Sequence, residues 1–145
     1  MGDEPAAAHP AATGALPTAS GPGRVLVAVY GVFALAATAR AGVQLATRFH
    51  QAPLAYALSA VSGVVYLVAT LALAGRGRSA RWLAWITVTT ELAGVLVVGT
   101  FSVLAPQDFP RATVWSAYGI GYGFVPLVLP FIGLWWLRRT GRGRS

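Results

Sequence analysis

Glu91 is the side chain in this sequence that is best placed to do chemistry. It lies near the middle of the run from Trp82 to Leu104, whose other residues are apolar, small or hydroxylic. A run of this length is enough to cross the hydrocarbon core of a bilayer, which takes about 20 residues. An ionisable group at such a depth is costly and is typically kept for pairing, binding or proton transfer.

Arg40 is a second charged side chain inside an apolar run. At a rise of about 1.5 Å per residue, Arg40 and Glu91 differ in depth by only about 8 to 9 Å. Helical side chains lean toward the N-terminus of their own helix, which turns Arg40 toward Glu91. The sequence therefore predicts that the two side chains meet, directly or through water, in a polar site completed by Gln44, Tyr66, Thr87 and Tyr122.

Three interpretations of this pair stay open. In the first, Glu91 and Arg40 form a buried pair that fixes the register of two helices. In the second, the carboxyl group of Glu91, which burial favours in its neutral form, binds and releases a proton or a cationic substrate as the protein changes shape. The four-span multidrug exporters use a lone membrane glutamate in this way, but in their first span, and Arg40 would repel a cation. The third interpretation is a membrane enzyme.

The composition indicates a membrane protein. Only 10% of the residues are charged, against about 25% in soluble domains. The mean hydropathy is +0.63. Apolar runs predict an all-α, polytopic membrane protein with spans at about 25–47, 54–74, 82–104 and 114–137. Each run carries one small or polar stripe, so we expect an antiparallel four-helix transmembrane bundle over residues 24–137.

The segments on either side of this domain read as tails. Residues 1–23 are rich in Ala, Pro and Gly and lack apolar periodicity, so we expect a disordered cytoplasmic tail. Residues 138–145 form a basic cytoplasmic tail. An alternative for the first span is a cleaved signal peptide, because Ala37-Thr38-Ala39 resembles a cleavage site.

Arginine placement predicts the orientation. With four spans, eight arginines fall on the side of both termini, and Arg48 and Arg111 fall on the other side. This asymmetry favours a multi-pass protein of a bacterial plasma membrane with both termini in the cytoplasm. Four tryptophans are expected at the inner face, and Phe109 and Trp115 at the outer face.

The fourth run contains Pro126 and Pro130, which remove backbone donors inside a predicted span. The carbonyl groups that they free need partners within a membrane. One interpretation is a kink whose carbonyl groups are satisfied by neighbouring helices. The other is a broken helix that lines a polar cavity.

Known catalytic patterns are missing from the sequence. It has no cysteine and two distant histidines, His9 and His50, and it contains no nucleotide-binding loop, metal motif or nucleophile–base set. We therefore expect no enzymatic activity, no cofactor and no metal site. The net charge of +7 is interpreted as a topology signal and not as a sign of nucleic-acid binding.

Three segments resemble a known group of proteins. They are Ala39-Arg40-Ala41-Gly42-Val43-Gln44-Leu45, the stretch from Glu91 to Thr100, and the stretch from Gly121 to Pro130. They are similar to parts of a family of small, uncharacterised four-span integral membrane proteins of high-G+C bacteria. The resemblance covers about Val25 to Leu137. It implies a four-helix protein of the plasma membrane and no particular activity.

The functional expectation follows from these points. The first hypothesis is a non-enzymatic membrane component that contacts other membrane proteins or a second copy of itself within the lipid bilayer. The alternative is a small proton-coupled or ion-coupled transporter that uses Glu91. A water-filled path to Glu91 favours the transporter, and a dry, fully paired Glu91 favours the interaction protein.

Overall fold

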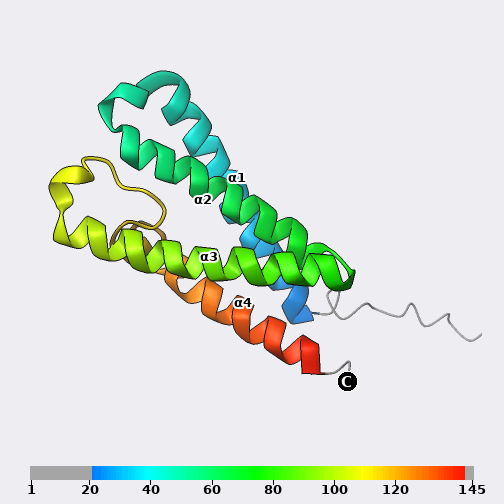
Figure 1. Ribbon diagram of the computed structural model, residues 1–145. Coiled ribbons are helices and arrows are strands. Elements are labelled where there is room, and N and C mark those ends of the chain that lie inside the picture. The colour runs from blue at the N-terminus through cyan, green and yellow to red at the C-terminus, as the bar shows by residue number, and fades with distance from the viewer. Residues whose placement is uncertain (1–20, 143–145) are drawn as a thin grey trace, which may run out of the picture.

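A computed structural model describes residues 21–142, and these residues are helical, with no strand among them (Figure 1). The four α-helices are α1 (Gly21–Arg48), α2 (Pro53–Ala74), α3 (Gly77–Leu104) and α4 (Val125–Arg142). Three short 3-10 helices connect them, namely η1 (Phe49–Gln51), η2 (Pro106–Asp108) and η3 (Ser116–Tyr122).

Within the described part of the chain, α1, α2 and α3 are each long and apolar enough to cross a membrane. Their 28, 22 and 28 residues correspond to about 42, 33 and 42 Å, against a hydrocarbon core of about 30 Å. The first three predicted spans are thus confirmed as helices, and the chain is compatible with a membrane location. A fourth span exists only if η3 and α4 count together as one broken element.

The helix boundaries extend beyond the predicted spans. α1 begins at Gly21, inside the predicted tail, and α3 begins at Gly77, before the predicted start of the third span at residue 82. α4 continues to Arg142, past the predicted end of the fourth span. The rest of the two predicted tails, 1–20 and 143–145, lies outside the described residues.

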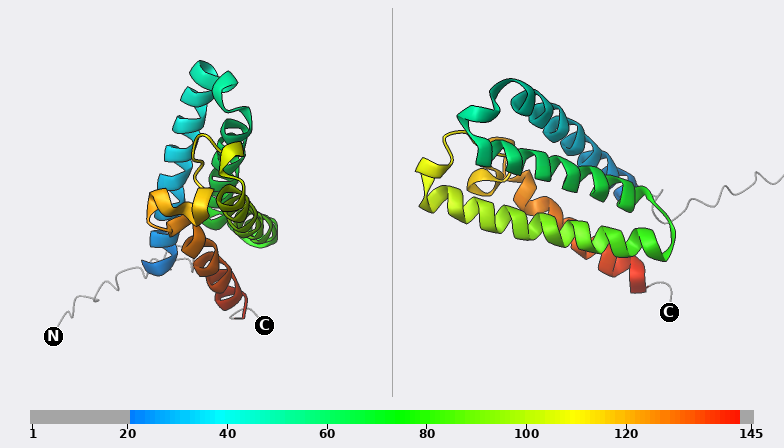
Figure 2. Two further views of the ribbon diagram at one scale, coloured as in Figure 1. Left: turned by 90° about the vertical axis from the view of Figure 1, so that its left-hand side faces the viewer. Right: turned by 45° about the horizontal axis from the view of Figure 1, so that its top comes forward.

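The helices run back and forth along one direction (Figures 1 and 2). α1 and α2 form a hairpin, α3 returns beside α2, and α4 lies along α3. The start of α1, the α2–α3 turn and the end of α4 lie at one end of the molecule, and the α1–α2 and α3–η2 turns lie at the other. Five of the six residues of the small or polar stripe predicted for α2 are buried, and the sixth, Thr70, is partly buried. The five are Ala55, Ser59, Ser62, Gly63 and Tyr66.

The fourth predicted span, 114–137, is not one continuous helix, which agrees with the broken-helix interpretation of this segment. η3 and α4 meet at an angle of 99°. Ala117, Tyr118 and Gly119 have φ angles of 46°, 60° and 82°, and Phe124 has a φ angle of 60°. A non-glycine residue in this left-handed region costs about 1–2 kcal/mol, so contacts elsewhere must hold the break in place.

Those contacts come largely from α3. Ser102 Oγ accepts a hydrogen bond from the backbone N–H of Ala117 at 2.8 Å, and the hydroxyl groups of Thr100 and Tyr118 are 2.8 Å apart. Gly99 allows this approach, because a Cβ atom there would lie 2.5 Å from Cδ1 of Tyr118. The break therefore depends on side chains far away in sequence, which a local pattern of Pro and Gly does not reveal.

The start of the broken segment satisfies its own backbone. The Thr113 backbone N–H donates to Ser116 Oγ at 2.8 Å, and the Ser116 backbone N–H donates to Thr113 Oγ1 at 3.1 Å. Thr113 and Ser116 are both buried. Irregular backbone inside a membrane protein needs such internal partners, because lipid supplies none.

Candidate functional site

Glu91 is fully buried in the interior of the bundle. Its exposed fraction is 0%, and Tyr30 Oη of α1 donates a hydrogen bond of 2.6 Å to its Oε2. Its other oxygen, Oε1, is buried and accepts no hydrogen bond of good geometry from any described residue. One carboxyl oxygen of Glu91 therefore has a hydrogen-bond donor and the other has none among the described residues, which is uncommon for a buried polar group.

Tyr66 of α2 and Trp115 form the other side of this site. The indole N–H of Trp115 donates to the hydroxyl group of Tyr66 at 3.2 Å, and both side chains are buried. The Tyr66 hydroxyl group also lies close enough to Glu91 to interact with it electrostatically. A tyrosine hydroxyl that has accepted one bond still has its own proton and a second lone pair, so Tyr66 can donate to Glu91 or accept from it.

Two glycines allow four segments of the chain to meet around Glu91. A Cβ atom at Gly94 of α3 would lie 2.7 Å from Cζ3 of Trp115, so the indole ring packs directly on the α3 backbone. A Cβ atom at Gly133 of α4 would lie 3.1 Å from Tyr30 Oη. Small residues at these points let the helices approach closely, as expected in membrane bundles.

Arg40 does not pair with Glu91, so the predicted ion pair is wrong. Its Nη1 donates to the Tyr122 hydroxyl group at 2.7 Å, and its Nη2 donates to the carbonyl oxygen of Ala112 at 2.8 Å. Tyr122, one of the predicted site residues, therefore lies beside Arg40 and not beside Glu91. The guanidinium group holds the broken segment and not the carboxyl group.

The position of Tyr30 on α1 shows how far apart the two groups lie. Tyr30, which bonds to Glu91, precedes Arg40 by ten residues, or about 15 Å along the helix. Phe33 packs against a tyrosine of each group, with its ring centroid 5.6 Å from that of Tyr66 and 5.8 Å from that of Tyr122.

The remaining predicted site residues lie elsewhere. The Thr87 hydroxyl group donates to the carbonyl oxygens of Leu83 and Ala84 in its own helix, at 2.9 and 3.3 Å. Gln44 is partly buried, and no described residue bonds to its Oε1. The predicted cluster therefore divides into Glu91 with Tyr66, Arg40 with Tyr122, and two residues that join neither group.

Sequence reasoning missed Tyr30 and Trp115. Tyr30 lies three residues before Phe33 and so on the same face of the first span. This spacing is the signal in the sequence that could have placed Tyr30 in the site. Trp115 was expected at the outer membrane face, but only 2% of it is exposed. Its position depends on the break in the fourth span, so no local pattern could place it beside Tyr66.

The site offers hydroxyl and carboxyl groups and no cation among its described partners. A carboxylate in a low-dielectric interior is costly unless it is paired or binds a cation or a proton. Within residues 21–142, no three His, Cys, Asp or Glu side chains gather closely enough to hold a metal ion. Uptake and release of a proton is a chemistry that this geometry allows.

Comparisons with known proteins add no family to these observations. The resemblance to small membrane proteins of high-G+C bacteria accordingly stays a prediction. No protein-family model, no curated protein and no solved structure matches the chain.

Proposed function

We propose that this chain is a small proton-coupled transporter of a bacterial plasma membrane, and that the carboxyl group of Glu91 binds and releases the coupling proton. The observation that carries the proposal is the meeting of four segments at one half-satisfied carboxyl group. Tyr30 of α1 bonds to Glu91 of α3, and Tyr66 of α2 neighbours it while bonded to Trp115 of the broken segment. A change in the charge of Glu91 therefore acts on each of these four segments.

The two tyrosines suit both states of the carboxyl group. In the carboxylate state, Tyr30 and Tyr66 can each donate a hydrogen bond to one oxygen. In the neutral state, Tyr66 can instead accept a bond from the protonated oxygen, which reverses the direction of the contact. Trp115 donates to the same Tyr66 hydroxyl group, so its hydrogen bond changes with the protonation state of Glu91. This links the strained segment after Trp115 to proton binding.

The broken fourth element supports a transport role. Discontinuous helices near a buried ionisable residue are a recurring arrangement in secondary transporters, because their loose backbone moves more easily than a continuous helix. In this chain the break lies at Ala117–Gly119 and is held by hydrogen bonds to α3. Glu91 lies on the same helix, α3.

The finer architecture belongs to the same proposal. An antiparallel four-helix transmembrane bundle, with η3 and α4 together as its fourth span, leaves both termini on one side of the membrane. The start of α1 and the end of α4 lie at the same end of the molecule, which supports this arrangement (Figure 1). Seven of the arginines of the described residues lie in the segments at that end, which supports a cytoplasmic position for both termini.

Proton movement in proteoliposomes tests the transport role. Vesicles that contain the protein and a pH-sensitive dye receive a pH step while the membrane potential is clamped with an ionophore. We expect the wild type to dissipate the gradient faster than Glu91→Gln. Thr87→Val is the matched control, because the Thr87 hydroxyl group bonds only to its own helix, and it should behave as the wild type. Equal rates for the wild type and Glu91→Gln would contradict proton movement through Glu91.

A second candidate is the non-enzymatic membrane component that contacts other membrane proteins or itself. One observation favours it. Every residue from Gly42 to Gln51 is exposed except Gln44, which is partly buried. The Oε1 of Gln44 has no partner among the described residues. Polar side chains in membrane helices often bond across a helix–helix contact.

Oligomeric state separates the two candidates. If this end of α1 is a contact surface, Gln44→Leu should reduce cross-linking between protein copies or to membrane partners, and it should leave proton movement unchanged. Unchanged cross-linking in Gln44→Leu would remove this candidate.

A further inference from the structure

The end of the bundle where α3 begins is strongly basic. Its arginines are Arg24, Arg76, Arg78, Arg81, Arg138, Arg139 and Arg142. The acidic residues among the described ones are Glu91, which is buried, and Asp108, which lies in η2 at the opposite end of the molecule. The described part of this end therefore carries far more positive than negative side chains.

The arginines of this end differ in what they contact. Arg81 donates to the carbonyl oxygen of Leu137 and to the hydroxyl group of Thr140, so it ties α3 to α4. The guanidinium group of Arg139 lies 5.2 Å from the ring centroid of Trp135. Arg78, in the first turn of α3, is exposed and makes no hydrogen bond, ion pair or ring contact with any residue from 21 to 142. Its charge is available to a partner outside the described chain.

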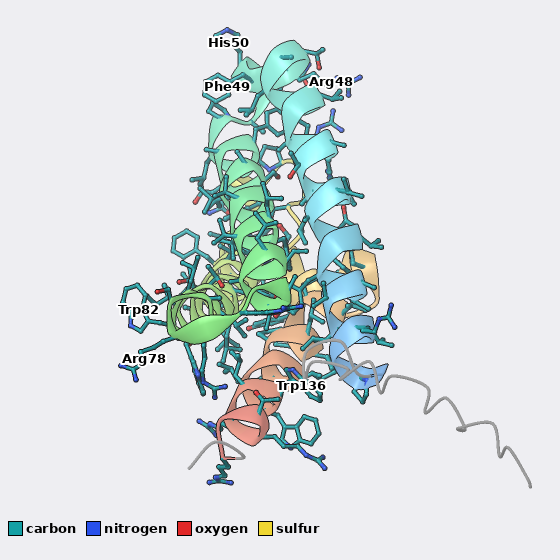
Figure 3. The ribbon with its side chains drawn as sticks, turned by 90° about the vertical axis from the view of Figure 1, so that its right-hand side faces the viewer. Arg48, Phe49, His50, Arg78, Trp82 and Trp136 are labelled. Carbon is teal, nitrogen blue, oxygen red and sulfur yellow. The ribbon has the colours of Figure 1, made fainter. Side chains whose placement is uncertain are left out.

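A shallow groove lies beside Arg78. Arg78, Ser79, Trp82 and Leu83 line it, and its volume is about 510 Å³. Trp82 is 66% exposed and Leu83 is 38% exposed, so the side of the groove toward the middle of α3 is apolar. Figure 3 shows Arg78 and Trp82 projecting from the same side of α3, away from the rest of the bundle.

We propose that this groove binds an anionic phospholipid. The phosphate group pairs with the guanidinium group of Arg78 and accepts a hydrogen bond from the hydroxyl group of Ser79, and the glycerol and acyl chains lie along Trp82 and Leu83. The order of the residues fits a lipid at a membrane surface, with the charge at the helix end and the apolar side chains one turn deeper. The first turn of α3 has no acidic residue and no side-chain cap, so its backbone adds positive potential.

The apolar half of the groove distinguishes a lipid from other anions. A free phosphate ion would use Arg78 and Ser79 and leave Trp82 and Leu83 exposed to water. A lipid covers both halves at once, which explains why a large exposed indole directly follows the charged turn. The proposal does not depend on the role of Glu91, because no residue of the groove contacts Glu91 or its hydrogen-bond partners.

Native mass spectrometry of the full chain in detergent with phosphatidylglycerol tests the proposal. We expect Arg78→Gln to weaken phosphatidylglycerol binding by about five-fold, the value of one interfacial arginine. Arg24→Gln removes the same charge from the same end, and Arg111→Gln removes it from the opposite end. Both control residues are exposed and should keep most of the binding.

A second variant and two competitors complete the test. Trp82→Ala should also weaken phosphatidylglycerol binding while leaving every charge in place. Phosphatidylcholine and inorganic phosphate should compete poorly, because the first lacks net negative charge and the second lacks the apolar part. Equal losses in Arg78→Gln and Arg24→Gln, or unchanged binding in both Arg78→Gln and Trp82→Ala, would overturn the proposal. Efficient competition by inorganic phosphate would overturn it in favour of a simple anion site.

Discussion

Arg40 and Glu91 are two ionisable residues inside apolar helices, and their surroundings differ in opposite ways. Arg40 is partly exposed and gives both of its terminal nitrogens to the broken segment, at Tyr122 and Ala112. Glu91 is fully buried and has one bond, from Tyr30, while its Oε1 has no well-placed donor among the described residues.

The difference indicates a structural role for Arg40, whereas our proposal gives Glu91 a role in proton binding. A guanidinium group that donates to a backbone carbonyl oxygen and a hydroxyl group stabilises a particular conformation, because its removal leaves acceptors unpaired. A half-satisfied carboxyl group stabilises its surroundings less, and its neighbours can serve either of its protonation states. We therefore expect substitutions around Arg40 to change stability and substitutions around Glu91 to change proton binding.

The largest expected effect on stability is at Arg40. Arg40→Leu should lower the free energy of unfolding in detergent by about 2–3 kcal/mol, because the Ala112 carbonyl oxygen and the Tyr122 hydroxyl group lose a charged donor. Thermal unfolding followed by circular dichroism measures the loss. A loss in Arg40→Leu that is smaller than the loss in Glu91→Gln would reverse the comparison.

Gly94→Ala comes next. The added methyl group would lie 2.7 Å from the Trp115 ring, so the ring must move away from α3 at a cost of about 1–3 kcal/mol. Because the same ring bonds to Tyr66, proton binding at Glu91 should change as well. Gly42→Ala is the matched control, since a Cβ atom there meets nothing within 4 Å. Similar stability in both variants would show that Trp115 does not pack on α3 as described.

Tyr30→Phe should have a smaller effect, about 1 kcal/mol, because it removes one hydrogen bond and keeps the ring. Tyr56→Phe is the control. Tyr56 is equally well buried, at 2% exposed, but its hydroxyl group bonds to no residue of the described range. Equal losses in the two variants would mean that the bond to Glu91 contributes nothing to folding.

The smallest expected effect is the coupling between Arg40 and Glu91. In a double-mutant cycle of Arg40→Gln and Glu91→Gln, the two changes in unfolding free energy should add to within about 0.5 kcal/mol, because the two groups share no hydrogen-bond partner. A coupling energy above about 1 kcal/mol would restore the pair that the sequence suggested.

The sequence predicted the parts of the fold that depend on local pattern. Apolar length located α1, α2 and α3, and a stripe of small residues identified the buried face of α2. The sequence leaves a broken fourth span as one of two interpretations, but it does not locate the break. The break depends on Ser102 and Thr100 of α3, which bond to Ala117 and Tyr118 across the structure. Proline and glycine indicated a weak helix there, but not its left-handed turn.

The candidate site was predicted in part for the same reason. The sequence predicts Glu91 and Tyr66 in one site, and the two side chains lie close enough to interact electrostatically. The sequence predicts a charged partner for Glu91 because opposite charges attract, but the partner in the structure is the neutral hydroxyl group of Tyr30. Tyr30 reaches the carboxyl group with less desolvation than a guanidinium group would suffer. The direction of Arg40 was decided by the broken segment, which no local pattern described.

Infrared spectroscopy of the reconstituted protein tests the central claim most directly. The pH-dependent difference between wild type and Glu91→Gln isolates the C=O stretching band of the protonated Glu91 carboxyl group. The claim predicts a band that disappears reversibly as the pH rises while the protein stays folded, and that shifts in Tyr30→Phe. A Glu91 signal that does not change over the whole pH range of the folded protein would contradict the claim and leave the carboxyl group a structural residue.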